Sequence, residues 1–159
     1  MAFTCEDVDD SAALNIFSDI FGGGPYSYLF SNVREKLSLC YYCAARVRKN
    51  KGLLIVDSGV DANNIEKAKE QILIEKAKIE KGEFTDELIA TSKKSMLEAL
   101  KANNDSDLVL DVWYSLKPRS IKSVEDMAEE IVAVNKQEII DVAKKFKLDT
   151  VFMLVPEEN

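Results

Sequence analysis

Apolar residues recur at helical spacing over most of the chain and gather as in strands over four short stretches. Residues 1–4 predict the end of a strand. Asp9 and Asp10 can cap a helix over residues 11–21, which the Gly-Pro run at 22–25 then ends. A second helix is expected over residues 26–36. The predicted buried stripes are Ala13, Ile16, Phe17 and Ile20 on the first helix, and Leu29, Phe30, Val33 and Leu37 on and just after the second.

Two stretches either side of a polar turn predict a β-hairpin. Residues 39–47 are rich in Tyr, Cys and Ala, residues 53–56 are apolar, and the turn lies at 49–52. Asn50 and Gly52 both tolerate a positive φ. The sequence therefore predicts two antiparallel strands joined by this turn.

The middle of the chain predicts two long helices. Asp61 can cap the first, which would run to Glu80 before Gly82 stops it. Thr85 can cap the second, which Asn103 and Asn104 would break, and helical character resumes over 107–116. Their apolar stripes are Ile65, Ala68, Ile72 and Ile79, then Ile89, Met96, Ala99 and Leu100. The glutamates and lysines of the first of these helices, including Glu75 and Lys76, read as a solvated face with i,i+4 pairs.

Two capping signals precede the last helices. Ser123 with Asp126 and Asn135 with Glu138 each have the spacing of a capping box. The stripe of the last helix is Ile139, Val142, Ala143 and Phe146. Residues 150–155 are apolar throughout, which predicts a final, central strand. A hairpin, a returning strand and many helices indicate an α+β fold, with a mainly antiparallel sheet and helices on one face.

Composition narrows the function classes. The chain has 159 residues, which read as one continuous unit, and 21 Lys+Arg against 28 Asp+Glu give a net charge of −7. This balance argues against a nucleic-acid partner, and neither a membrane-spanning run nor a signal peptide is seen. Three cysteines, an odd number, favour reduced thiols and a cytoplasmic location.

The chain contains no histidine. A Ser/His/Asp or Cys/His triad, a histidine general base and a histidine-containing zinc site are therefore excluded within it.

Two motifs suggest chemistry weakly. Cys40 and Cys43 have the C-x-x-C spacing, but residues three apart in a strand point to opposite faces, so we favour small apolar fillers over a metal or redox pair. The glycines at 22–24 precede a helix, as in anion sites, but lack the P-loop Lys-Ser/Thr. We favour a tight turn there.

Arg34 and Tyr41 would lie on either side of a helix-to-strand corner. Together they could offer hydrogen bonds to a carbonyl or an oxyanion. On spacing alone, a surface Arg–Glu contact and a tyrosine at the edge of the core remain the simpler interpretation.

Residues 21–30 (FGGGPYSYLF) and 33–41 (VREKLSLCY) closely resemble a signature of the insulinase/pitrilysin-like (M16) zinc peptidases. The signature belongs to the half-domain without zinc, the one like the C-terminal half. Its matching positions are Gly22, Gly23, Gly24, Ser27, Phe30, Arg34, Glu35 and Tyr41. The likeness spans most of residues 1–100 and rests on element order beyond Asn104.

The resemblance implies a fold shared with subunits of the mitochondrial processing peptidase. It also implies a partner, the zinc-bearing half-domain, facing this one across a chamber that holds a peptide substrate. Arg34 and Tyr41 match the arginine and tyrosine with which the family holds the substrate backbone. The zinc ligands, in H-x-x-E-H, belong to that partner, so no cofactor and no metal ligand is expected in this chain, which would be inactive alone.

Two departures from the family shape the expectation. Strands precede the position of Met1 in the family, so we expect residues 1–159 to be one partial domain of a bacterial member, truncated at its N-terminus. Cys40 stands where the family usually has Gly or Ala. We expect a substrate-positioning half of a metalloendopeptidase. The alternatives are a scaffold or binding domain of an inactive homologue, and an unrelated domain with a chance match. A truncated sheet would also favour homo-oligomers.

Overall fold

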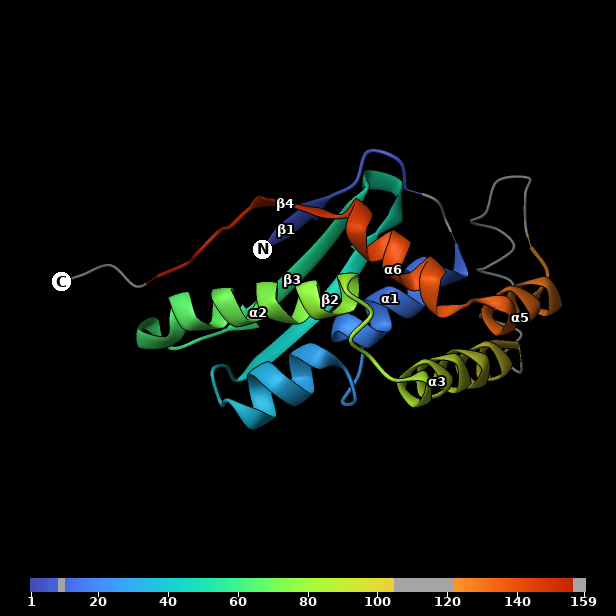
Figure 1. The fold of residues 1–159 in the computed structure, drawn as a ribbon, viewed down its shortest axis with the longest axis horizontal. Helices are drawn as coiled ribbons and strands as arrows, with labels where there is room; N and C mark the ends of the chain where they lie inside the picture. Colours follow the sequence, from blue (N-terminus) through green and yellow to red (C-terminus); the bar gives the residue numbers. More distant parts are fainter. Residues whose placement is uncertain (9–10, 105–121, 156–159) are drawn as a thin grey trace.

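A computed structural model describes residues 1–8, 11–104 and 122–155, and the arrangement of its elements is α+β (Figure 1). The strands are β1 (Ala2–Thr4), β2 (Tyr42–Arg48), β3 (Leu53–Gly59) and β4 (Lys147–Thr150). The helices are α1 (Ala12–Gly22), η1 (Leu29–Lys36), η2 (Lys49–Lys51), η3 (Ala62–Asn64), α2 (Ile65–Glu80), α3 (Asp86–Asn104), α5 (Val124–Ala133) and α6 (Lys136–Lys145).

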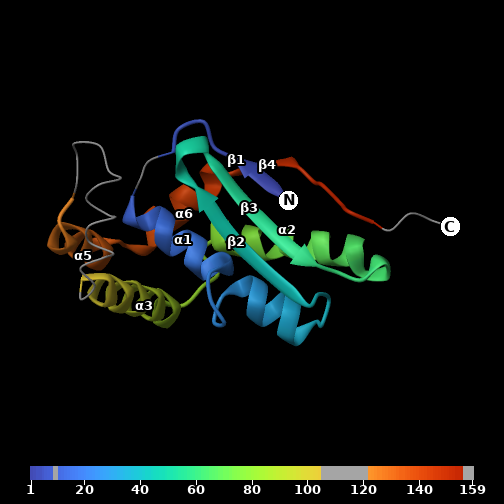
Figure 2. The same ribbon diagram turned by 180° about the vertical axis from the view of Figure 1, so that it is seen from behind.

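The four strands form one antiparallel sheet in the order β2-β3-β1-β4. The predicted hairpin is confirmed, with Arg46 opposite Ile55, and Gly52 adopts a φ of 60° in its turn. Helices lie in front of the sheet in Figure 1, and the reverse view in Figure 2 shows β2 and β3 in front of them. The predicted fold class, with helices on one face, is therefore confirmed.

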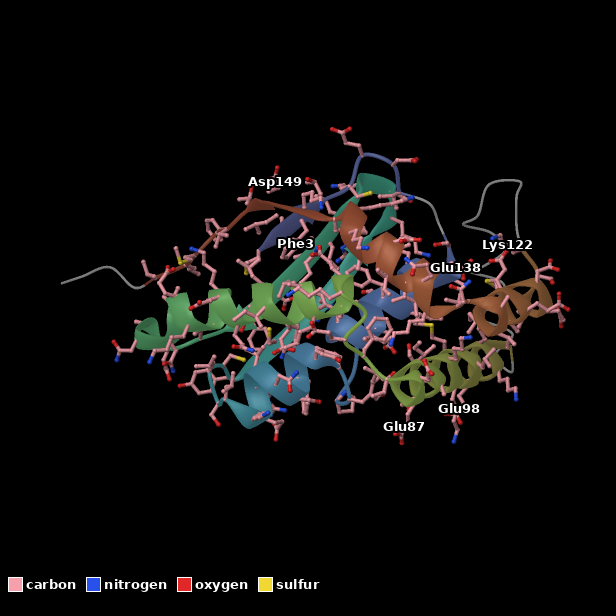
Figure 3. All side chains as sticks on the ribbon, in the orientation of Figure 1. Phe3, Glu87, Glu98, Lys122, Glu138 and Asp149 are labelled. Carbon is pink, nitrogen blue, oxygen red and sulfur yellow. The ribbon has the colours of Figure 1, made fainter. Side chains whose placement is uncertain are left out.

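Helix α1 forms the centre of the core. Most of its residues are buried, and it contacts β2, α3, α5 and α6. Phe17 stacks on Phe21 with 5.9 Å between ring centroids and lies 6.0 Å from Phe146. Phe3 faces the same layer and is 1% exposed, whereas Glu87 and Glu98 point outward from α3 (Figure 3). The buried members of the predicted apolar stripes thus meet in one core, whereas Phe30, also predicted to be buried, is only half-buried.

The predicted helix boundaries hold where a side chain caps the helix. Ser123 and Asp126 form a capping box, as do Asn135 and Glu138, and Thr85 accepts a hydrogen bond from the Leu88 amide. Ser11 caps α1. The alternative caps Asp9 and Asp10, and the expected helical stretch 107–116, lie outside the described residues.

The prediction for the last strand is wrong. Strand β4 spans Lys147–Thr150 at the edge of the sheet, and all four of its residues are exposed. Its neighbour β1 offers only three residues, so the ladder ends where Ala2 meets Thr150. Residues 152–155 continue beyond the ladder, and their side chains are 49–89% exposed.

Smaller corrections concern the middle of the chain. The strand expected from residue 39 begins at Tyr42, the strand expected to end at 56 runs to Gly59, and the positive φ in their turn belongs to Gly52 and not to Asn50. Leu37 is 44% exposed because it follows the end of η1. Ala99 is also exposed.

The charged face predicted for α2 is partly wrong. Glu75 has no exposed surface and Lys76 is 5% exposed, because η1 and α6 pack against that side of the helix. In the described part of the chain, no helix combines the length and apolarity needed to cross a membrane.

Candidate functional site

The glycine run makes a close contact between α1 and the sheet. A Cβ atom on Gly22 would lie 2.5 Å from the backbone nitrogen of Ala45 in β2, and one on Gly23 would lie 2.6 Å from Asp19 Cα. Neither position leaves space for a side chain. The interpretation of these glycines as a tight turn therefore has a steric cause, and Gly24 completes it by accepting a hydrogen bond from the Ser27 amide.

Ser27 begins the next helical stretch from a fully buried position. Its hydroxyl accepts a hydrogen bond from the Phe30 amide at 3.4 Å, and its carbonyl accepts one from the Ser31 amide. The helix that follows, η1, has wide π-type turns. At its end the Leu37 amide donates to the carbonyl of Asn32, five residues earlier. Such helices are uncommon and often occur at functional sites.

The chain then turns sharply towards β2. Ser38 has a φ of 51°, the single positive φ among the described residues other than glycine. The Leu39 amide donates to the Val33 carbonyl, which folds the corner back onto η1. This corner brings the end of a helix next to the start of a strand, as the spacing of Arg34 and Tyr41 predicted.

Arg34 joins the two sides of the corner. Its Nε donates to the backbone carbonyl of Tyr41 at 2.9 Å, and its NH1 lies 3.2 Å from Glu35 Oε1. The guanidinium carbon lies 4.6 Å from the ring centroid of Phe30, in a cation–π contact. The side chain still has 38% of its surface exposed.

Tyr41 is 69% exposed, and its phenol extends over the same corner. The hydroxyl donates to Oδ1 of Asp61 at 2.9 Å, and this hydrogen bond with the carboxylate raises the pKa of Tyr41. Arg34, Tyr41 and Asp61 line an open hollow of about 330 Å³ together with Glu35, Ser38, Leu39 and Cys40. The structure therefore places Arg34 and Tyr41 on one rim.

Asp61 was missed by sequence reasoning as a residue of this site. Its position before a helix predicted a cap, but its side chain makes no capping hydrogen bond, and a short 3₁₀ turn separates it from α2. No local signal in the sequence distinguishes an aspartate that caps a helix from one that turns back to a residue 20 positions earlier.

The two cysteines differ in environment. Cys43 is 5% exposed on the helix-covered face, whereas Cys40 lines the hollow. The prediction that both cysteines lie in one strand and point to opposite faces is wrong, because β2 begins only at Tyr42 and the two thiols interact. Burial, with a smaller contribution from Cys40, raises the pKa of the Cys43 thiol to about 12. A buried thiol of this kind is a poor metal ligand. Across the described ranges, no group of three or more His, Cys, Asp or Glu residues is placed to hold a metal ion.

Comparison with known proteins identifies the family to which the chain is similar. Residues 1–96 match the family described as the peptidase M16 inactive domain. A Bacillus subtilis (strain 168) protein named "Probable inactive metalloprotease YmfF" is 35% identical over 152 residues, covering 94% of this chain and 36% of that protein.

Solved structures share the fold. A conserved protein from Enterococcus faecalis V583 superposes with a TM-score of 0.84 at 30% identity, covering 92% of this chain and 36% of that one. A peptidase M16 inactive domain from Pseudomonas fluorescens gives a TM-score of 0.72 at 20% identity, covering 92% and 37%. The chain spans little more than a third of the length of these relatives. It belongs to the family of peptidase M16 inactive domains.

Proposed function

We propose that this chain is the substrate-positioning half of an M16-type metalloendopeptidase and is inactive alone. The observation that carries the proposal is the shared rim, where Arg34 and Tyr41 flank one open hollow. A guanidinium and a phenol are hydrogen-bond donors that suit the carbonyl groups of an extended peptide. The catalytic zinc and its ligands would belong to a partner half-domain, and the pair would act on peptides in the cytoplasm.

The packing of Arg34 supports the proposal. The Phe30 ring, the Tyr41 carbonyl and the Glu35 carboxylate hold the guanidinium in position in the unliganded chain. A group held in place loses less side-chain entropy on binding than a mobile one. The signature residues thus divide into two sets. Gly22, Gly23 and Ser27 fix the end of α1 and the start of the next helical stretch, and Arg34 and Tyr41 line the hollow.

The proposal is tested with Arg34→Ala and Tyr41→Phe in the protein that joins this chain to its zinc-bearing half. Each substitution is expected to lower kcat/KM for peptide cleavage on the order of 100-fold, the cost of removing one donor from a developing oxyanion. Arg46→Ala and Tyr42→Phe are matched controls. Arg46 and Tyr42 lie on β2 with exposed side chains but do not line the hollow.

Unchanged kcat/KM in both variants would refute the proposal. The chain alone offers a second measurement. Addition of a short unstructured peptide of alternating alanine and serine residues should shift the NMR signals of Arg34 and Tyr41, and leave those of Arg46 and Tyr42 in place.

A second function is favoured by the Bacillus subtilis relative, whose name describes it as probably inactive. In this case the domain would keep the fold as a scaffold or binding module and would take part in no cleavage. Inspection of the gene upstream in the same open reading frame, or in the adjacent one, separates the two functions. An intact H-x-x-E-H motif supports the first, and degenerate copies support the second.

A further inference from the structure

The only hydroxyl proton of Tyr41 is already used. The phenol donates to Asp61 across 2.9 Å, and both side chains are exposed at the edge of the hollow. A neutral tyrosine has one O–H group and so donates one hydrogen bond at a time. In the arrangement that the structure shows, Tyr41 cannot donate to a peptide carbonyl without leaving Asp61.

The Asp61 carboxylate and a peptide carbonyl compete unequally for the Tyr41 hydroxyl proton. A hydrogen bond to an ionised carboxylate is shorter and stronger than one to a neutral carbonyl. The side chain of Asp61 makes no capping bond to the helix that follows, so its interaction with Tyr41 is the one hydrogen bond that the side chain makes in the described part of the chain.

We propose that Asp61 is a latch on the peptide-holding rim: its carboxylate retains the Tyr41 hydroxyl in the unliganded chain, and a peptide carbonyl has to displace it. The inference rests on the proposed function, because it concerns how the same rim is regulated. Asp61 thus lowers the affinity of the rim for the peptide by competing for the Tyr41 hydroxyl. Peptides that make few other contacts with the chain should therefore bind weakly, because they have to displace Asp61 first.

The test compares Asp61→Asn with the unsubstituted chain. Peptide affinity is measured by NMR titration with the alanine–serine peptide. The neutral amide competes less well for the phenol proton, so the dissociation constant should fall by roughly 3- to 10-fold, the range expected when a charged acceptor is replaced by a neutral one. Glu66→Gln is the matched control. It removes the same charge from an exposed residue nearby that pairs with Lys69.

The double variant Tyr41→Phe/Asp61→Asn isolates the latch. If Asp61 acts through the phenol, the gain in affinity from Asp61→Asn should vanish in the Tyr41→Phe background. An equal gain in both backgrounds would overturn the latch, since it would reflect only the lost charge. Unchanged or weaker binding by Asp61→Asn would overturn it as well.

Failure of the latch and failure of the proposed function give different results. If Tyr41→Phe weakens peptide binding and Asp61→Asn does not strengthen it, the latch is wrong and the peptide-holding role stands. If Tyr41→Phe and Arg34→Ala both bind as the unsubstituted chain does, the peptide-holding role fails, and the latch fails with it. A readout independent of affinity is the ¹³C signal of the Asp61 carboxylate. It should move on saturation with peptide in the unsubstituted chain and stay fixed in Tyr41→Phe.

Discussion

At the scale of single residues, a carboxylate without exposed surface supports the helix that carries Arg34. Glu75 of α2 accepts hydrogen bonds from Asn32 Nδ2 at 2.7 Å, from Gln71 Nε2 at 2.6 Å and from Lys78 Nζ at 2.8 Å. A buried charge is tolerated only when it is paired and fully hydrogen-bonded. The bond to Asn32 also ties α2 to the wide turns of η1, two residues before Arg34.

Replacement of this carboxylate should be costly. Glu75→Ala leaves Asn32 and Gln71 without their acceptor and opens a cavity, so the free energy of unfolding should fall by about 2–4 kcal/mol. Urea denaturation checks this. Glu70→Ala, an exposed glutamate on the same helix, is the control and should change stability by less than about 0.5 kcal/mol. Equal losses in the two variants would contradict a structural role for Glu75.

Cys43 gives a residue-scale prediction for pH. Burial raises the pKa of its thiol from about 9 in the unfolded chain to about 12. The unfolded state therefore loses this proton first as pH rises. The contribution of Cys43 to stability is complete below pH 9 and is lost between about pH 9 and 12.

Cys43→Ala should remove this loss. The free energy of unfolding is measured at pH 8 and pH 10 in both proteins. The unsubstituted chain should lose up to about 1.4 kcal/mol more than the variant over that interval, since other titrating groups are common to both. Parallel pH dependences would contradict the assignment.

The sequence reveals little of this residue-scale detail. Arg34 and Tyr41 could be named as candidates because they fall within a dense signature, and the structure brings them together. Asp61 and Glu75 could not be, because each meets partners across a turn or another helix. Charge patterning describes the surface of an isolated helix and carries no information on which of its faces another element covers.

At the scale of elements, the end of α1 lies close against the backbone of β2. Gly22 permits it, because a methyl group there would lie 2.5 Å from the Ala45 nitrogen and 2.7 Å from its Cβ. The ladder that joins β2 to β3 holds the β2 backbone in place, so it cannot move away from α1 readily. The orientation of α1 thus depends on the lack of a side chain at Gly22. The corner that carries the rim depends on that orientation in turn.

Gly22→Ala should destabilise the chain by about 1–3 kcal/mol through overpacking. The comparison variant is Gly24→Ala, whose added methyl group would meet only the Tyr26 ring, at 3.3 Å. Thermal unfolding should show a clear loss of Tm for the first and a small change for the second. Similar Tm values for both would refute the steric argument.

Elements whose ends are marked by residues nearby in the sequence could be predicted well. Elements whose extent or burial depends on a partner far along the chain could not. The capping residues of α3, α5 and α6 lie within three residues of the amide that each one binds. The local sequence therefore predicts where each of these helices begins. The apolar run at 150–155 has the composition of a buried strand. Its exposure depends on how far β1 extends beside it, which is information from the other end of the chain.

At the scale of the whole molecule, apolar surface concentrates at the free end of the sheet. Phe152 is 78% exposed and Leu154 is 89% exposed, and the segment extends away from the layers alone in Figures 1 and 2. Extended apolar segments next to an open sheet edge favour pairing with another chain. Self-association of this chain is therefore expected.

Sedimentation velocity over a range of concentrations tests this. The unsubstituted chain should show a sedimentation coefficient that rises with concentration, and Phe152→Ser/Leu154→Ser should remain close to monomeric. The fold should tolerate the double substitution because neither side chain is in the core. A monomer at all concentrations in both proteins would contradict the prediction.

The coverage of one sheet face by helices also separates two classes of position on β2. Cys43 and Ala45 point towards α1 and are nearly inaccessible, whereas Arg46 and Arg48 point away from it and are exposed. In a library of random substitutions on this strand, the positions that face α1 should accept only side chains of similar volume. The positions on the opposite face should accept side chains of many sizes. Engineering of the neighbouring rim can start from the permissive set, where new side chains alter solubility or charge and leave the packing of α1 intact.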